Sequence, residues 1–292
     1  MKPKFVQNYH ARMQRVLDHI DAHLDGDLSV AVLSGIAAFS RCHFHRQFAA
    51  LYGVGVYRYV QLMRLKRASY QLAYRDDTIL QIALDNGYES PEAFARAFRQ
   101  QTDQSPSAFR REPRWEPWHA AVEPLHQPRS FQMQQFSNDQ VRILDFPDTP
   151  VAILEHRGDP ALIGDSIRRF IGWRKANAML PATSATFNIL HCDPEDTPAR
   201  DYRFDLCAAT GRTVEPNDAG VVAGLIPGGR CAVLRLTGSG DDLRPAVSFL
   251  YGEWLPKSGH ELRDFPVFAQ RVRFFPDVPG HAAETDIFLP LV

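Results

Sequence analysis

The sequence predicts a multidomain protein: an all-α N-terminal domain with two helix-turn-helix units, followed by an α+β domain of two βαββ repeats. Three observations lead to this prediction. The first half repeats itself at an offset of 49–50 residues, the second half repeats at an offset of 80, and the segment 113–130 between them contains four prolines. Internal repeats identify the units from which a fold is built, so each half should form one domain.

Each unit of the first half has the pattern of a helix, a tight turn and a second helix. The motif Phe-x-Arg-x-Phe at 44–48 recurs 50 residues later at 94–98. Ser40 is a favourable N-cap for the second helix of the first unit, and Pro91 suits the first turn of its counterpart. The apolar spacing of 56–72 predicts a long helix that connects the two units.

The proline-rich segment predicts a linker between the domains. Proline lacks the amide hydrogen that the interior of a helix or sheet requires, and four prolines fall within 113–130. The predicted boundaries are therefore 1–112 for the helical domain, 113–130 for the linker and 131–292 for the second domain. We expect a fragment that ends near Arg114 to fold and bind DNA alone, because its repeats supply a complete helical core.

Each repeat of the second half has the order strand, helix, strand, strand. Identical residues at the offset of 80 include Leu154 and Leu234, and Gly172 and Gly252. The first copy consists of strands at 151–156, 186–190 and 202–209 with a helix over 163–179, and the second consists of strands at 231–236, 266–274 and 285–292 with a helix over 243–255. We expect the two copies to join at a pseudo-twofold seam with a cleft, where ligand pockets are common.

Charge is distributed unevenly along the chain. Residues 1–114 contain 16 Lys/Arg and 11 Asp/Glu, a net charge of +5, whereas residues 115–292 contain 17 and 23, a net charge of −6. This asymmetry favours a polyanion such as double-stranded DNA as a partner of the first half only. The chain has no apolar run long enough for a membrane span and no signal peptide at its start, so we expect a cytoplasmic protein. Its four cysteines include no Cys-x-x-Cys pair, and neither a metal site nor a cofactor is predicted.

The second helix of each helix-turn-helix unit, here called the recognition helix, should contact DNA. In this motif it enters the major groove, where base edges present a distinctive pattern of donors and acceptors. The two phenylalanines of each recognition helix must face the core, which turns the opposite side outward. The candidate DNA contacts on that side are Arg41, Cys42, His45 and Arg46 in the first helix and Glu92, Ala95, Arg96 and Arg99 in the second. Lys66 and Arg111 are candidate phosphate contacts.

Residues 9–111 resemble the AraC-type DNA-binding domain. The resemblance is carried by SRCHFHRQF, by SPEAFARAF and by the ending Ser105-Pro106 with Phe109-Arg110. It implies seven helices, with both recognition helices in successive major grooves on one face of the DNA. Val56 stands where the family often has proline, and Asp103 stands where it often has glycine. Asp tolerates the left-handed conformation that such a turn requires better than most residues do.

Residues 140–292 resemble the GyrI-like effector-binding domain of multidrug-responsive regulators. The motifs that carry the resemblance are His156-Arg157-Gly158, Tyr202-Arg203-Phe204-Asp205, Ile226-Pro227-Gly228-Gly229, Trp254-Leu255-Pro256 and Asp286-Ile287-Phe288-Leu289-Pro290. The resemblance implies an amphipathic or cationic aromatic ligand in an aromatic pocket that contains a glutamate. Ala269 stands where relatives often place that glutamate, so a cationic ligand would need Glu155 or Glu253 instead.

Aromatic side chains are the other candidate ligand contacts, because they offer a planar ligand a large contact area and their ring faces attract cations. Together with the two glutamates, the candidate ligand-binding residues are Glu155, Trp173, Tyr202, Phe204, Glu253, Trp254 and Phe268. We expect the ligand to lie at the seam and to touch both repeats.

The sequence therefore predicts a sequence-specific DNA-binding transcription regulator whose second domain senses a small aromatic or amphipathic molecule. RNA polymerase is a candidate partner, and no enzymatic activity is predicted. Two alternatives remain open. Some GyrI-like proteins are hydrolases that use a pocket carboxylate, which Ala269 replaces here. A redox sensor would act through Cys42, because the helix N-terminus and Arg41 would stabilise a thiolate there.

Overall fold

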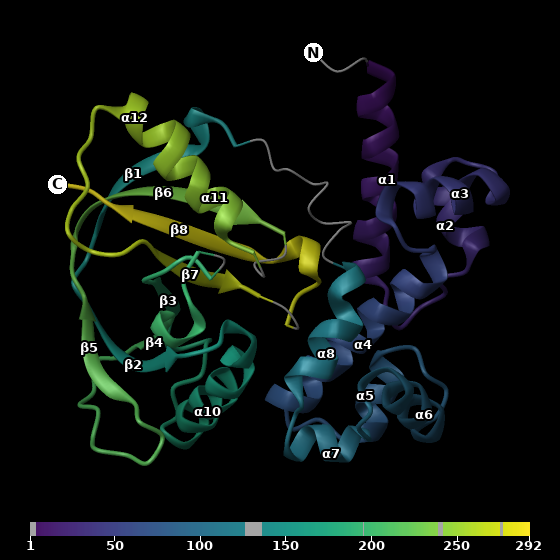
Figure 1. The fold of residues 1–292 in the computed structure, drawn as a ribbon, viewed down its shortest axis with the longest axis horizontal. Helices are drawn as coiled ribbons and strands as arrows, with labels where there is room; N and C mark the ends of the chain where they lie inside the picture. Colours follow the sequence, from purple (N-terminus) through teal and green to yellow (C-terminus); the bar gives the residue numbers. More distant parts are fainter. Residues whose placement is uncertain (1–3, 126–135, 195, 239–241, 275–276) are drawn as a thin grey trace. The chain divides into compact units, whose positions relative to one another are not determined.

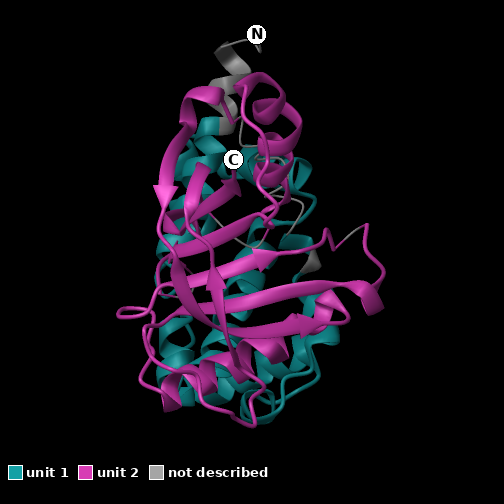
Figure 2. Cartoon of the chain, turned by 90° about the vertical axis from the view of Figure 1, so that its left-hand side faces the viewer, with its two compact units in different colours: residues 1–133 teal, residues 134–292 magenta. Residues whose placement is uncertain are grey.

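The computed structural model describes residues 4–125, 136–194, 196–238, 242–274 and 277–292. The chain forms two compact units, unit 1 (Met1–Met133) and unit 2 (Gln134–Val292), shown in Figures 1 and 2. Among the described residues, no helix combines the length and the apolar character needed to cross a membrane.

Unit 1 is helical. Its helices are α1 (Lys4–Ala22), α2 (Val30–Ala37), α3 (Arg41–Tyr52), α4 (Val56–Tyr74), α5 (Ile79–Asp85), α6 (Pro91–Thr102), α7 (Pro106–Arg111) and α8 (Trp115–Val122). Helices α2 and α3 form the first helix-turn-helix unit, and α5 and α6 form the second (Figure 1). Helix α4 is the predicted connecting helix.

Local caps fix where the recognition helices begin and end. The side chain of Ser40 accepts a hydrogen bond from the backbone N–H of His43, and Ser90 accepts one from Ala93 at the start of α6. These bonds satisfy amide groups that have no partner within the helix. Helix α6 ends at Asp103, whose φ of 54° lies in the left-handed region. The interpretation of this residue as a substitute for glycine is confirmed.

The core of unit 1 contains the two phenylalanines of each recognition helix. Phe44 and Phe48 of α3 and Phe94 and Phe98 of α6 are each at most 1% exposed. Because residues four apart lie on one side of a helix, this burial decides which side of α3 and α6 faces outward. The predicted orientation of both helices is confirmed.

The structure differs from the predicted linker over the first part of 113–130, because Trp115–Val122 is helix α8. Trp115 and Trp118 are each 3% exposed, and their rings lie 5.9 Å and 5.4 Å from those of Tyr74 and Tyr70 on α4. Two buried tryptophans stabilise a short helix by the apolar area that they remove from water.

Proline does not prevent this helix. Pro117 is the third residue of α8, in the first turn, where backbone amides have no partner within the helix. The core of unit 1 therefore extends beyond Arg114 to Leu125, which is 1% exposed. The remainder of the predicted linker, 126–130, lies outside the described residues.

Unit 2 is built on an eight-stranded antiparallel sheet with the order β1-β6-β8-β7-β3-β4-β2-β5. Its strands are β1 (Val141–Phe146), β2 (Thr149–Arg157), β3 (Thr186–Leu190), β4 (Arg203–Ala209), β5 (Val222–Ile226), β6 (Gly229–Thr237), β7 (Phe268–Arg273) and β8 (Glu284–Pro290). Its longer helical segments are α10 (Ile163–Ala176), α11 (Arg244–Phe249), the π-helical turn η5 (Leu250–Trp254) and α12 (Leu255–Ser258). The two βαββ repeats, β2-α10-β3-β4 and β6-α11-β7-β8, are confirmed, and they meet where β3 pairs with β7 (Figure 1).

Each repeat also has a leading strand that pairs with the other repeat. Strand β1 runs into β2 but pairs with β6, and β5 runs into β6 but pairs with β2. Where the two chain segments cross, the backbone N–H of Gly228 donates to the carboxylate of Asp148 at 2.6 Å. This exchange of strands holds the two repeats together in one sheet.

Side chains fill the space between the repeats. The helices cover one face of the sheet, with α10 over the apolar residues of β2 and β4 and α11 to α12 over those of β6 and β8. The opposite face carries a phenylalanine cluster from both repeats: Phe146, Phe187, Phe265, Phe268 and Phe288. Neighbouring ring centroids in this cluster lie 4.7–6.4 Å apart.

Candidate functional site

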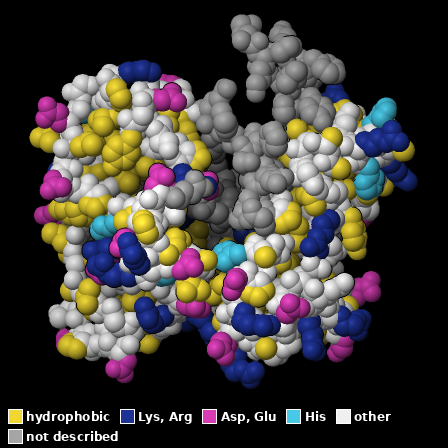
Figure 3. Space-filling model, in the orientation of Figure 1, with side chains coloured by type: hydrophobic (Ala, Val, Ile, Leu, Met, Phe, Trp, Pro, Cys, Tyr) yellow, Lys and Arg dark blue, Asp and Glu magenta, His cyan; other side chains and the backbone are white. Residues whose placement is uncertain are grey.

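Helix α3 presents its predicted DNA-contacting side to solvent. Arg41, Cys42, His45 and Arg46 are all exposed, on the side opposite the two buried phenylalanines. Figure 3 shows basic and histidine side chains gathered over the region of α3. Exposed arginines at the start of such a helix can donate to phosphate oxygens or to the acceptors of guanine.

Helix α6 presents the equivalent side. Glu92, Arg96 and Arg99 are exposed, and Ala95 is half-buried. Arg96 occupies the position in α6 that Arg46 occupies in α3. In each helix the arginine lies midway in sequence between the two buried phenylalanines. Both helices thus have the arrangement that contact with base edges requires, and the contact itself stays a prediction.

Lys66 does not belong to this surface, and its prediction as a phosphate contact is wrong. Its side chain is 5% exposed on α4, with the ammonium 5.9 Å from the centre of the Tyr70 ring. The aliphatic stem of a lysine can pack among apolar residues, and α4 is surrounded by other elements along much of its length. Arg111, at the end of α7, is exposed and stays a candidate.

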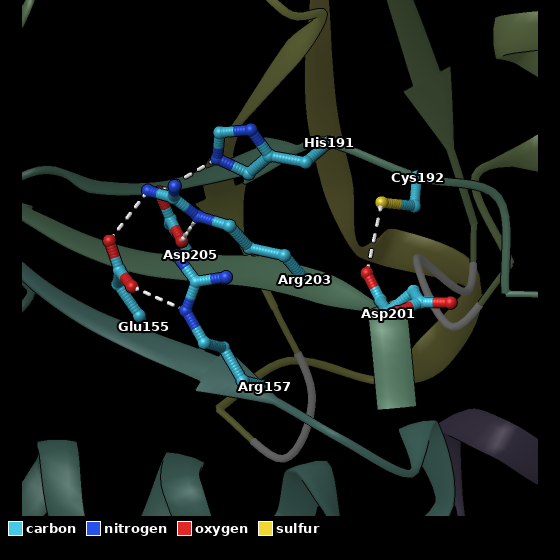
Figure 4. Close-up of polar contacts among 7 residues, drawn as sticks. All are labelled: Glu155, Arg157, His191, Cys192, Asp201, Arg203 and Asp205. Atoms are coloured by element: carbon cyan, nitrogen blue, oxygen red, sulfur yellow. Dashed lines mark hydrogen bonds and ion pairs between the residues drawn. The ribbon is translucent and has the colours of Figure 1, made fainter. Parts of the chain in front are cut away.

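In unit 2, Glu155 belongs to a polar cluster on β2, β4 and the residue after β3 (Figure 4). Its carboxylate accepts a hydrogen bond from Arg157 Nε at 2.8 Å and pairs with Arg203 Nη2 at 2.7 Å. Arg203 also donates to Asp205 at 2.9 and 2.8 Å, and His191 Nε2 lies 2.8 Å from the same carboxylate. Arg157 and Arg203 therefore offset the charges of the two carboxylates, Glu155 and Asp205.

Asp205 is the buried member of this cluster, with 1% exposure. Burial by itself would raise the pKa of its carboxyl, but hydrogen bonds and charges from His191 and Arg203 outweigh burial and hold the pKa below its usual range. The neighbouring Cys192 has a different partner, since its thiol donates to the carbonyl of Asp201 at 3.9 Å (Figure 4).

The two aromatic candidates next to this cluster are largely inside the first repeat. Tyr202 is 5% exposed, and burial together with the nearby Cys192 and Asp193 raises its pKa to about 12, so the phenol is neutral. Phe204 is half-buried and packs against the apolar residues beneath α10.

Two hollows lie next to each other along α10. The first has a volume of about 390 Å³ and is lined by Leu154, Glu155, Arg169, Asp218, Ala219, Gly220 and Val222. The second has a volume of about 230 Å³ and is lined by Trp173, Asn177, Met179, Thr210, Arg212, Thr213, Val214, Glu215, Pro216 and Asn217. Arg169 and Trp173 are one turn apart on one side of α10, and the segment 210–220 borders both hollows.

The structure does not bring the seven predicted ligand-binding residues together. Glu253 is exposed on η5, and Trp254 is 7% exposed with its ring 6.0 Å from that of His260. Phe268 is fully buried at the seam and stacks on Phe288 at 4.7 Å. Of the seven candidates, Glu155 lines the first hollow described above and Trp173 lines the second.

Arg169 and Asp218 line the first hollow and were not among the predicted residues. Asp218 lies in the connection between β4 and β5, far from α10 in the sequence. No periodic pattern marks such a residue, because its position depends on how a long connection folds back over a helix.

The model of the GyrI-like small molecule binding domain matches residues 139–292, more than half of the chain. The chain belongs to the GyrI-like family. In this GyrI-like protein a helix-turn-helix domain model also matches residues 33–112.

Two relatives are each similar to part of the chain. A probable transcriptional regulator, YgiV of Escherichia coli K12, is 38% identical over 152 residues, which are 52% of this chain and 95% of YgiV. An uncharacterized helix-turn-helix regulator of Staphylococcus aureus, SAR0107, is 37% identical over 99 residues, which are 34% of this chain and 13% of that protein.

Two solved structures are similar in part. The DNA complex of EcmrR is 14% identical with a TM-score of 0.43, over 90% of this chain and 98% of that one. The DNA-binding domain of AdpA with a target DNA is 27% identical with a TM-score of 0.31, over 36% of this chain and 96% of that one.

This GyrI-like protein is a DNA-binding transcription regulator. It combines an AraC-type helix-turn-helix domain with a GyrI-like small-molecule-binding domain.

Proposed function

We propose that a small aromatic or amphipathic molecule binds to unit 2 beside α10, and that its binding changes how strongly the regulator occupies DNA. The proposal rests on the position of Trp173. Its ring is half-buried and lies parallel to that of Phe170, at 2° and 6.1 Å, while it also lines the 230 Å³ hollow. A tryptophan that is held on one side and open on the other offers a planar ligand contact area at low cost in conformational entropy.

The charges near this site favour a neutral or weakly charged ligand. Glu155 is paired with Arg157 and Arg203. The first hollow contains both Arg169 and Asp218, and the second contains both Arg212 and Glu215. An approaching cation meets no unbalanced carboxylate among these residues, so its electrostatic gain is small. Ala269, in place of an acid, adds no negative charge at the seam. We therefore expect neutral aromatic compounds to compete with cationic ones.

On DNA, we propose that Arg46 and Arg96 contact base edges in two successive major grooves. The observation that supports this is their equivalent, exposed position on the two recognition helices. RNA polymerase is the partner through which such a regulator would act on transcription, and we propose no enzymatic activity for the chain.

Calorimetry on the full chain tests the ligand proposal, with 1-naphthol as a neutral probe and tetraphenylphosphonium as a cationic probe. We expect micromolar affinity for aromatic probes and at least a tenfold loss in Trp173→Leu. Tyr251→Leu, which removes an exposed aromatic ring from the second repeat, is the matched control and should leave affinity unchanged. The bound probe should also shift the anisotropy titration of labelled operator DNA. Absence of binding across the probes, or equal binding to Trp173→Leu, would contradict the proposed site.

A further inference from the structure

Arg64 lies in the middle of α4, the helix that connects the two helix-turn-helix units. Its guanidinium donates from Nε to the carbonyl of Leu24 at 2.8 Å and from Nη2 to the carbonyl of Gly26 at 3.2 Å. Both carbonyls belong to the connection between α1 and α2, directly before the first unit. One planar group therefore holds the backbone that leads into this unit.

The same guanidinium contacts the turn of the second unit. Gly87 lies between α5 and α6 with a φ of 71°, and a Cβ added there would lie 2.5 Å from Arg64 Nη2 and 2.7 Å from its Cζ. That Cβ would also lie 3.0 Å from the carbonyl of Leu24. The turn of the second unit and the connection that leads into the first unit thus meet at Arg64, and the space at Gly87 admits a hydrogen atom only.

Tyr88 connects this junction to the second recognition helix. Its ring lies 5.3 Å from that of Phe94, the first buried phenylalanine of α6. Burial raises the pKa of the Tyr88 phenol, and the charge of Arg64 acts in the opposite direction. A displacement of Arg64 would consequently reach α6 through Gly87 and Tyr88.

A second set of contacts, one turn further along α4, attaches the second unit to this helix independently. Arg67 Nε donates to Asn86 Oδ1 at 3.0 Å, and Asn86 Nδ2 donates to Gln71 Oε1 at 2.7 Å. Asn86 is fully buried. Removal of Arg64 should therefore leave the second unit folded on α4 and release mainly its fixed position relative to the first.

We propose that Arg64 is a positioning residue that fixes the distance and angle between the recognition helices α3 and α6, and thereby sets the spacing of the two DNA half-sites that the regulator accepts. The inference rests on the proposed contact of both helices with DNA. An arginine suits this task because its planar fork of donors reaches two carbonyls at once, whereas a lysine offers a single charged point.

The test measures affinity against half-site spacing. The full chain is titrated with an operator of two half-sites, with the same operator carrying one base pair more or fewer between them, and with each half-site alone. One inserted base pair shifts the second half-site by about 3.4 Å and turns it by roughly a tenth of a helical turn. We expect wild-type protein to lose at least tenfold in affinity for either altered spacing.

Arg64→Gln and Arg64→Lys should bind each single half-site within about twofold of wild type, while their preference for the original spacing falls below about threefold. Gly87→Ala, which forces a methyl group against the unchanged guanidinium, should also alter the preferred spacing. Arg15→Gln is the matched control, because it removes the charge of an exposed arginine on α1. It should keep the wild-type spacing preference.

A folded Arg64→Lys or Arg64→Gln protein with the wild-type spacing preference would overturn the inference. Loss of cooperative melting in both variants would overturn it too, since Arg64 would then serve the fold alone. If wild-type protein bound single half-sites as tightly as the full operator, the proposed contact of both helices with DNA would be wrong. The proposed role of Arg64 would then be wrong as well.

Discussion

Both units are built from two similar copies, but the copies keep their surface residues to different degrees. In unit 1 the same outward arginine occurs in both recognition helices, as Arg46 and Arg96. In unit 2, residues 80 positions apart differ in kind: Trp173 of α10 corresponds to Glu253 of η5, and Glu155 of β2 corresponds to Arg235 of β6. Two copies that retain a surface side chain can perform one task twice. Two copies that share their fold but not their surface side chains can have different functions. We therefore propose that the ligand binds beside the first copy only.

The largest loss of stability should follow from shortening unit 1. This change tests whether its two helix-turn-helix units form a complete domain without α8. A fragment 1–114 lacks Trp115 and Trp118, and truncation of a single buried aromatic side chain already costs about 3–5 kcal/mol. We expect fragment 1–125 to melt cooperatively, and fragment 1–114 to be unfolded or to melt at least about 15 °C lower by circular dichroism. Equal melting of the two fragments would show that α8 is dispensable.

The next largest loss of stability should distinguish the buried seam between the two repeats from the surface of the first repeat. Phe268→Ala should lower the free energy of unfolding by about 3–5 kcal/mol, because it opens a cavity in the phenylalanine cluster that joins both repeats. Trp173→Ala should cost at most about 2 kcal/mol, since the side chain is only half-buried. Urea unfolding of the full chain measures both. A Phe268→Ala protein as stable as wild type would indicate that the seam is not a filled core.

The equivalence of the two recognition helices can be measured directly. Arg46→Ala and Arg96→Ala should each weaken specific DNA binding by about 1–3 kcal/mol, and non-specific binding by much less, because contacts to base edges carry sequence information. Fluorescence anisotropy at a fixed salt concentration gives both affinities. Arg15→Ala serves as the control for lost charge. Unchanged operator affinity in either variant would show that the two recognition helices do not contribute equally to specific binding.

The smallest change in stability is expected in the polar cluster of the first repeat of unit 2. Because the pKa of Asp205 is held below its ordinary value of 3.8, its ionised form stabilises the fold above about pH 4, and this contribution disappears as the pH falls through the lowered pKa. Asp205→Asn should melt a few degrees lower than wild type at pH 7 and show a flatter dependence of Tm on pH below 4. Asp145→Asn, at an exposed position, is the control. A variant with the pH dependence of wild type would show that Asp205 contributes nothing to it.

Features with a repeat or a fixed helical spacing could be predicted from the sequence, and features that depend on distant packing could not. The spacing of Phe44 and Phe48 determines a buried side of α3, so Arg46 had to face outward. Proline content suggested a linker, but it carries no information on where Trp115 and Trp118 pack. In unit 2, the sequence marks Phe268 and Trp173 equally as aromatic. Only the packing of both repeats shows that the first fills the seam and the second borders a hollow.

The central claim is that two equivalent recognition helices make this protein a sequence-specific regulator, and selection from a randomised DNA library tests it most directly. Wild-type protein, Arg46→Ala and Arg96→Ala are each used to enrich sequences under the same conditions. We predict that wild type selects a two-part motif with its parts about one helical turn apart, that Arg46→Ala loses sequence preference in one part only, and that Arg96→Ala loses it in the other. Enrichment of no motif by wild type, or of the unaltered motif by both variants, would contradict the claim.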